Sequence, residues 1–241
     1  MEGMPRRLRL QYPDAIYHLM ARGNGRQDIV CDDVDRDLLL QHLGRTAVRC
    51  SWSIYAFAIM SNHLHIVLKT PQPNLSRGMQ AFLSAYANGW SRRHRFSGHV
   101  FQGRYRTELV EDETYLWTVT RYVHLNPVRC RLVEHPAAWA WSSYPGYAHR
   151  RRRLEWVAYD ERLASWGGAF GGPDPGDGLP AVCDRGIVRS ARVALNRGVS
   201  RLDPREPCFH RSTRRDGAWQ TSPTAAAGVA TVTRPAYFTS K

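Results

Sequence analysis

The sequence predicts an α+β fold of the ferredoxin-like, split β-α-β type, with a mostly antiparallel sheet and helices packed on one face. Three observations predict it. Short apolar runs rich in strand-forming residues alternate with longer segments of helical periodicity. Their order is strand, helix, strand, strand, helix, strand, helix, which is typical of this architecture. Turn-forming and cap-forming residues separate the runs.

The first strand is expected over residues 15–21, because the run AIYHLMA contains extended-chain formers. The segment ARGNGRQ that follows it is a loop by its glycines and asparagine. A helix then opens near residue 31, where Asp32 or Asp33 can cap it, and Leu39 and Leu43 belong to its apolar face.

Two further strands are expected at residues 54–60 and 65–68, and the continuous apolarity of the first favours a central position in the sheet. A second helix is predicted from Leu75 to about residue 93 by its apolar spacing. Residues 99–110 indicate a loop that enters a strand. A third helix is expected from Glu111 to about Leu125, ended by Asn126-Pro127, because a residue before proline avoids helical geometry.

Domain organisation follows from a change of composition. Residues 1–150 are predicted to form one domain, residues 151–170 a linker with a short helix, and residues 171–241 a weakly ordered or disordered basic tail. The segment GGAFGGPDPGDG has the composition of a linker, and the chain after it is rich in Arg, Ala, Thr and Pro.

Composition favours a polyanionic partner. The 241 residues carry a formal net charge of +13, nearly all of it from arginine. Nucleic acid is the commonest partner of so basic a protein, although an arginine-rich proteome would give the same balance. No signal peptide and no run of ~18 apolar residues is present, so a cytoplasmic location without membrane contact is expected. The five cysteines include no CxxC pair, which argues against a zinc knuckle.

Four residues carry the candidate chemistry. His63 and His65 are two apart on an expected strand, so both imidazoles project from one side and suit a divalent metal. Tyr122 and Asn126 are four apart on an expected helix and share a face. If that face packs over the sheet, Asn126 is a third ligand and Tyr122 reaches a metal-held phosphate. The alternatives are two strand histidines without a metal, a core tyrosine, and an asparagine that ends its helix.

The joint pattern resembles the single-tyrosine HUH transposases, in the branch of REP-associated tyrosine transposases. The resemblance covers roughly residues 4–147. It lies in ordered blocks, namely MPRRLRLQYPDAIYHLMARGN, AFAIMSNHLHIVLKT, PNLSRGMQ, GHVFQGRYRTELVEDETYL, RYVHLNPVR and WAWSSY.

The resemblance implies that His63 and His65 bind Mg²⁺ or Mn²⁺, that Asn126 is the third ligand, and that Tyr122 is the nucleophile. It implies cleavage and rejoining of single-stranded, hairpin-bearing DNA through a 5′-phosphotyrosine intermediate. Seven residues are candidates for nucleic-acid binding: Asn24, Arg22, Arg26, Arg77, Arg104, Arg106 and Arg121.

Three hypotheses follow for the function. The favoured one is the DNA strand-transferase, acting as a monomer or a homodimer. The second is a catalytically silent or domesticated nucleic-acid-binding protein of the same fold. The third is a metal-dependent phosphoesterase in which water replaces Tyr122 as the nucleophile.

Overall fold

The computed structural model describes residues 11–170, 212–215 and 218–221. Its main sheet has four strands, β1 (Ala15–Arg22), β2 (Ser53–Ile59), β3 (His63–Thr70) and β4 (Arg106–Val110). They lie in the order β2-β3-β1-β4, and every neighbouring pair is antiparallel. The α+β class and the antiparallel sheet predicted from the sequence are therefore confirmed.

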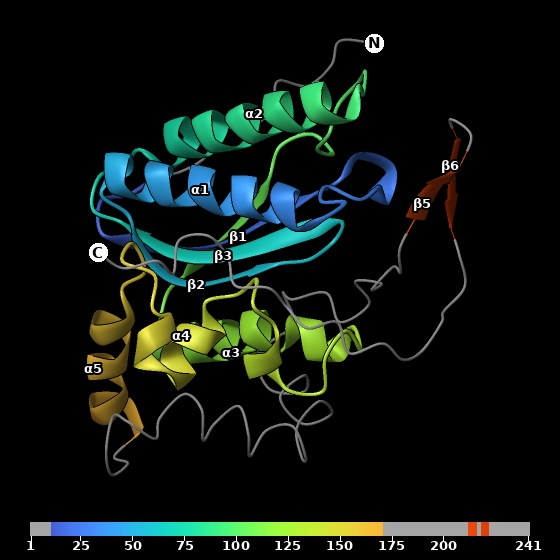
Figure 1. The fold of residues 1–241 in the computed structure, drawn as a ribbon. Coiled ribbons are helices and arrows are strands. Elements are labelled where there is room, and N and C mark those ends of the chain that lie inside the picture. Colours follow the sequence, from blue (N-terminus) through green and yellow to red (C-terminus); the bar gives the residue numbers. More distant parts are fainter. Residues whose placement is uncertain (1–10, 171–211, 216–217, 222–241) are drawn as a thin grey trace, which may run out of the picture.

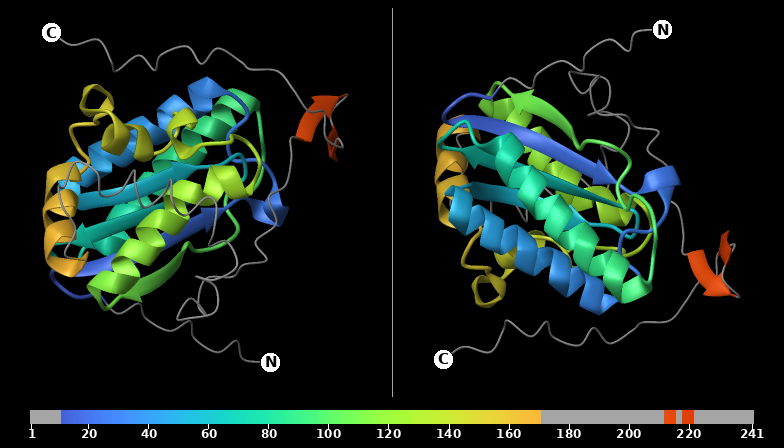
Figure 2. Two further views of the ribbon diagram at one scale, coloured as in Figure 1. Left: turned by 90° about the horizontal axis from the view of Figure 1, so that it is seen from below. Right: turned by 90° about the horizontal axis from the view of Figure 1, so that it is seen from above.

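Helices cover both faces of this sheet. Helices α1 (Asp33–Cys50) and α2 (Leu75–His94) pack side by side on one face, while α3 (Glu113–Arg129) and α4 (Tyr144–Ala148) lie on the other, as Figures 1 and 2 show. The expectation that the helices occupy one face is corrected by this arrangement.

The central strands require cover on both sides because residues of both parities are buried. Leu64 and Ile66 of β3 belong to the larger apolar cluster beneath α1 and α2. Val67 belongs to a second cluster with Val119 and Val123 of α3. Successive side chains of a strand point to opposite faces, so the two clusters are the two faces of one sheet.

Helix α1 begins as the sequence predicts. The Asp32 carboxylate accepts a hydrogen bond from the Asp35 amide at 3.0 Å, and Asp33 and Asp35 add acidic charge to the first turn. Helix α2 starts at Leu75 and ends one residue beyond its expected limit.

Helix α3 does not end before its proline. It begins at Glu113 with Asp112 as its cap and continues through Pro127 to Arg129. Proline at this depth removes one intrahelical donor, but the Cys130 amide still donates to the Asn126 carbonyl at 3.0 Å. The restriction on residues before proline is a preference that the packed last turn overrides here. Tyr122 and Asn126 thus lie on one continuous helix.

The chain after α3 returns over the sheet. It forms short 3-10 turns at Pro136–Ala138 and Arg150–Arg152, then α5 (Tyr159–Phe170). The helix expected within residues 151–170 is present, and it packs on the domain. Its buried Arg162 forms an ion pair with Glu113 of α3 and stacks on Trp117.

The predicted tail, residues 171–241, lies outside the described residues except for a hairpin of β5 (Ser212–Arg215) and β6 (Ala218–Thr221). Among the described helices, none combines the length and apolar character that crossing a bilayer requires.

Candidate active site

The histidine pair lies at the start of β3, on the face that α3 covers. His63 and His65 share the parity of Val67, whereas Leu64 between them points into the opposite cluster. Both histidines are buried, with exposures of 2% and 1%. Their rings are 5.1 Å apart between centroids and perpendicular. The strand therefore presents two imidazoles from one side, as the sequence predicts.

Helix α3 brings a phenol and an amide to this pair. The Tyr122 ring lies 5.5 Å from the His65 ring between centroids, at 88° to it. Tyr122 is half-buried, and Asn126 one turn later is buried. Asn126 also interacts with His63, where it partly offsets the lowered pKa of that imidazole. The four candidate residues thus converge on one place between strand and helix.

The environment keeps both imidazoles neutral. Burial, reinforced by the Arg22 guanidinium, lowers the pKa of His63 to about 4. The pKa of His65 falls well below its usual value, chiefly through burial and then through the neighbouring His63. Neutral imidazole is the form that binds a metal ion, so near pH 7 this pair is ready to do so.

Asn62 fixes which nitrogen of His63 carries the proton. The Asn62 amide nitrogen donates to the Arg26 carbonyl at 3.3 Å, which turns its Oδ1 toward His63 Nδ1 at 2.7 Å. An amide oxygen only accepts, so His63 donates from Nδ1 and has its lone pair on Nε2. The Nε2 atoms of both histidines are buried at this site. The donor set therefore fits a divalent metal, with two imidazole nitrogens and an amide oxygen.

Four residues beside the site were not predicted from the sequence. Asn62 is one. His18 of β1 stacks on His65 with 5.3 Å between ring centroids, and Glu108 of β4 lies beyond it. The fourth is Arg129, whose guanidinium carbon is 5.0 Å from the centre of the Tyr122 ring. The sequence offered one indication of His18, which is a polar residue within the apolar first strand. A buried polar side chain needs a hydrogen-bond partner, so a partner could have been expected.

The candidate nucleic-acid-binding residues divide by location. Arg22 is paired with His63 across the β1–β3 ladder and acts electrostatically on both histidines. Arg106 opposes Met20, which opposes His65, so these side chains share the face of the site. Arg106 is exposed.

The other candidates lie in loops or on helices. Asn24 and Arg26 are exposed in the 3-10 turn Asn24–Arg26, which Asn62 ties to the site. Arg104 is exposed in the loop before β4, and Arg121 precedes Tyr122 on α3. Arg77 is exposed on α2, across the sheet from the histidine pair, and is not brought to the site.

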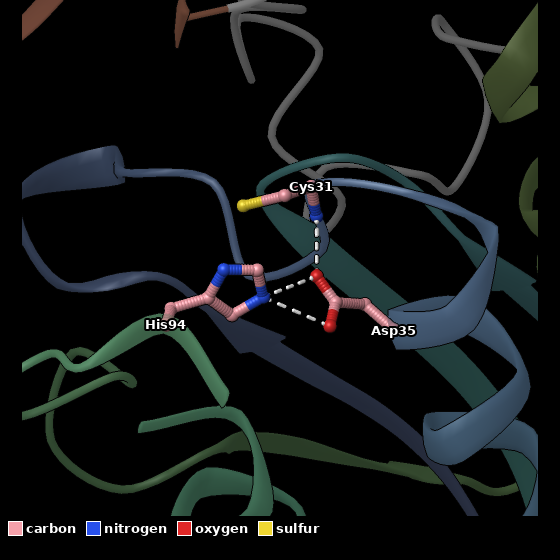
Figure 3. Close-up of side chains that lie close together, drawn as sticks. All are labelled: Cys31, Asp35 and His94. Carbon is pink, nitrogen blue, oxygen red and sulfur yellow. Dashed lines mark hydrogen bonds and ion pairs between the residues drawn. The ribbon is translucent and has the colours of Figure 1, made fainter. Parts of the chain in front are cut away.

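Two other histidines form contacts that stabilise the packing of the helices. His124 of α3 is fully buried and its Nε2 lies 2.8 Å from the Ser143 hydroxyl. Burial lowers its pKa to about 3. Cys31, Asp35 and His94 gather between the start of α1 and the end of α2, as Figure 3 shows.

In that second cluster the Asp35 carboxylate already accepts hydrogen bonds from the Cys31 amide at 2.8 Å and from His94 Nε2 at 2.9 Å. Arg93 also donates to it at 2.6 Å. A cation is thus already in place, so the cluster is a polar tie between α1 and α2.

The fold and the site define an α+β domain, with one antiparallel sheet between two layers of helices and a histidine pair that faces a tyrosine on α3. Residues 11–126 match the family model described as transposase, IS200 like. The resemblance predicted from the sequence is confirmed at this level. No curated protein matches the sequence.

Among solved structures, the chain is similar to a REP-associated tyrosine transposase bound to a REP hairpin, with 14% identity and a TM-score of 0.51. The match covers 59% of this chain and 84% of that one, and shows a shared fold. A candidate transposase from Deinococcus radiodurans R1 matches at 21% identity and a TM-score of 0.36, over 49% of this chain and 95% of that one. The tRNA(His) guanylyltransferase of Saccharomyces cerevisiae matches at 11% identity and 0.39, over 69% and 76%.

Proposed function

We propose that this protein cleaves and rejoins single-stranded DNA, with Tyr122 as the covalent nucleophile. The observation that carries the proposal is the convergence of the Tyr122 ring on the His65 ring, at 5.5 Å between centroids, in a domain that matches a transposase family model. A phenol beside two neutral imidazoles that can hold a metal suits phosphoryl transfer to tyrosine.

The proposed metal ligands are His63, His65 and Asn126. A bound Mg²⁺ or Mn²⁺ would supply Lewis-acid polarisation of a non-bridging phosphate oxygen. The protein holds the ligands for this task without needing a proton to leave, because both imidazoles are neutral near pH 7. Burial of the pair excludes bulk water, which strengthens every electrostatic interaction within the site.

In the proposed covalent step the Tyr122 phenol oxygen attacks the phosphorus in line. A bond forms between that oxygen and phosphorus, the bond from phosphorus to the 3′ oxygen breaks, and the phenol proton passes to solvent. The leaving 3′ oxygen takes up a proton and departs as a hydroxyl. Attack of a 3′ hydroxyl on the phosphotyrosine reverses these changes, so rejoining consumes no nucleotide triphosphate. Arg129, above the Tyr122 ring, is placed to offset negative charge as it moves.

The proposed substrate is a single strand that bears a hairpin. Support comes from the positive charge of the chain and from the related fold, whose structure contains a REP hairpin. Arg22 and Arg106 lie on the face of the sheet that carries the histidines, where they can contact phosphates. Asn24 and Arg26 border the same site through Asn62.

The test is a search for a covalent adduct. Purified protein is incubated with 5′-labelled and 3′-labelled hairpin-bearing single strands in Mn²⁺ or Mg²⁺, then denatured and separated by electrophoresis. Wild-type protein is expected to retain label in a denaturation-resistant band, and Tyr122→Phe is expected to lose it. EDTA and His63→Ala should abolish the band as well, because both remove the metal.

Tyr12→Phe is the matched control, since Tyr12 is 47% exposed and its carbonyl accepts from Thr70, at the opposite end of β3 from His63. It should still form the adduct. Cleavage by Tyr122→Phe at an undiminished rate would favour the metal-dependent phosphoesterase. Binding of the hairpin without cleavage by the wild type would favour the catalytically silent nucleic-acid-binding protein.

A further inference from the structure

His18 stands behind the histidine pair, between one proposed metal ligand and a carboxylate. It is 6% exposed on β1, where it opposes Val67 and Glu108 across the two ladders, so its side chain lies on the face of the site. Its Nε2 is 3.1 Å from His65 Nδ1, and its Nδ1 is 3.8 Å from Glu108 Oε2. Glu108 is itself held by the Tyr115 hydroxyl.

We propose that His18 is a positioning residue that sets the tautomer of His65. An ionised carboxylate only accepts, so Glu108 favours the His18 proton on Nδ1, the nitrogen that faces it. With its single proton on Nδ1, the His18 ring has its lone pair on Nε2. The hydrogen bond between the two rings consequently takes its proton from His65 Nδ1.

This arrangement leaves the lone pair of His65 on Nε2, the nitrogen that is buried at the proposed metal site. Asn62 achieves the same result for His63 through a different acceptor. The two imidazoles are therefore both oriented by partners on their Nδ1 side, one from a loop and one from the neighbouring strand. Such partners fix the ring orientation and the basicity of a ligating histidine.

The His18 ring also contacts Tyr122. The His18 ring lies edge-on to Tyr122, with 6.2 Å between centroids, and stacks on His65 with planes 14° apart. If His18 only filled space, a side chain with the shape of its ring and without a ring nitrogen would replace it. Phenylalanine keeps that shape, whereas glutamine loses the ring but can offer an amide oxygen to His65, so the two substitutions separate packing from hydrogen bonding.

The inference rests on the proposed function, because it concerns His65 as a ligand. The first measurement uses the metal-free, full-length wild type labelled with ¹⁵N-histidine. Long-range ¹H–¹⁵N correlation spectra, assigned with His65→Gln, should show the His65 proton on Nδ1. A proton on Nε2 would overturn the inference whether or not any variant folds.

The second measurement is Mn²⁺ binding by calorimetry to wild type, His18→Phe, His18→Gln and His63→Ala. His18→Phe should bind Mn²⁺ on the order of 10–100-fold more weakly than wild type. His18→Gln should recover a large part of that loss. Equal affinity of folded His18→Phe and wild type would overturn the inference.

The pattern of results distinguishes the two proposals. If wild type binds Mn²⁺, His63→Ala does not, and His18→Phe matches wild type, the tautomer role fails and the proposed metal site survives. If wild type shows no binding that depends on His63, the proposed metal site fails, and the role of His18 with it. Circular dichroism and thermal unfolding of each variant show whether it is folded.

Discussion

The contact of α5 with the tyrosine helix gives a prediction for stability. Arg162 is 1% exposed, and its guanidinium carbon lies 3.4 Å from the centre of the Trp117 ring. It also forms an ion pair with Glu113 at the start of α3. Arg162→Met keeps most of the apolar stem and removes the charge, so it isolates the polar contribution of this contact.

The magnitude follows from those contacts. Breaking a buried ion pair costs about 3–5 kcal/mol when the remaining partner stays buried and charged. Glu113 is 41% exposed and can recover hydration, which reduces the cost. A desolvated cation–π contact contributes ~2 kcal/mol. Methionine regains part of the loss by apolar packing, so the free energy of unfolding should fall by roughly 2–3 kcal/mol.

Urea unfolding followed by circular dichroism measures this change. At about 2–4 °C for each kcal/mol, the melting temperature should also fall by roughly 4–12 °C. Arg151→Met, at an exposed arginine of the same region, is the control and should stay within ~0.5 kcal/mol of wild type. An Arg162→Met protein as stable as wild type would refute the reasoning, because apolar packing would then replace the ion pair in full.

Three further predictions concern pH, DNA and packing. The pKa of His124 is about 3 in the folded protein and near 6.5 in the unfolded chain, so its contribution to stability is present above pH 6.5 and is lost as pH falls toward 3. Between pH 6 and 4 the unfolding free energy should fall by up to ~1.4 kcal/mol per pH unit from this group, and His124→Gln should flatten that slope. Arg106→Gln should weaken binding of single strands and reduce its salt dependence by about one ion, whereas Arg77→Gln, across the sheet, should leave both unchanged in fluorescence anisotropy titrations. Gly78→Ala would place a Cβ 2.2 Å from Trp52 Cζ2, so thermal unfolding should report a loss of about 1–3 kcal/mol, and an unchanged melting temperature would contradict the packing.

Local signals in the sequence predict most of the fold correctly. The cap at Asp32 predicts the start of α1, and the spacing of apolar residues predicts α2 to within one residue at its end. The sequence does not reveal which distant segments of the chain pack together. The second helical layer was not predicted. Alternate residues of β2 and β3 are buried on opposite faces of the sheet, and this shows that both faces are covered only when the packing partners of each face are known.

The candidate site shows the same division. The alternation of His63 and His65 and the helical spacing of Tyr122 and Asn126 predict which side chains share a face, and the structure has that arrangement. The prediction that α3 ends before Pro127 was wrong because it used only the local preference of the residue before proline. Packing of the last turn overrides that preference. His18 and its carboxylate partner were missed because they come from two other strands, whose register the sequence does not reveal.

The most direct test of the account is to locate the covalent bond. The adduct formed with a hairpin-bearing single strand in Mn²⁺ is digested with nuclease and protease, and the peptides are sequenced by mass spectrometry. The account predicts a nucleotide 5′-phosphate on the tyrosine at position 122, beside His65. A nucleotide attached to any other side chain, or efficient cleavage that leaves no modified peptide, would contradict it.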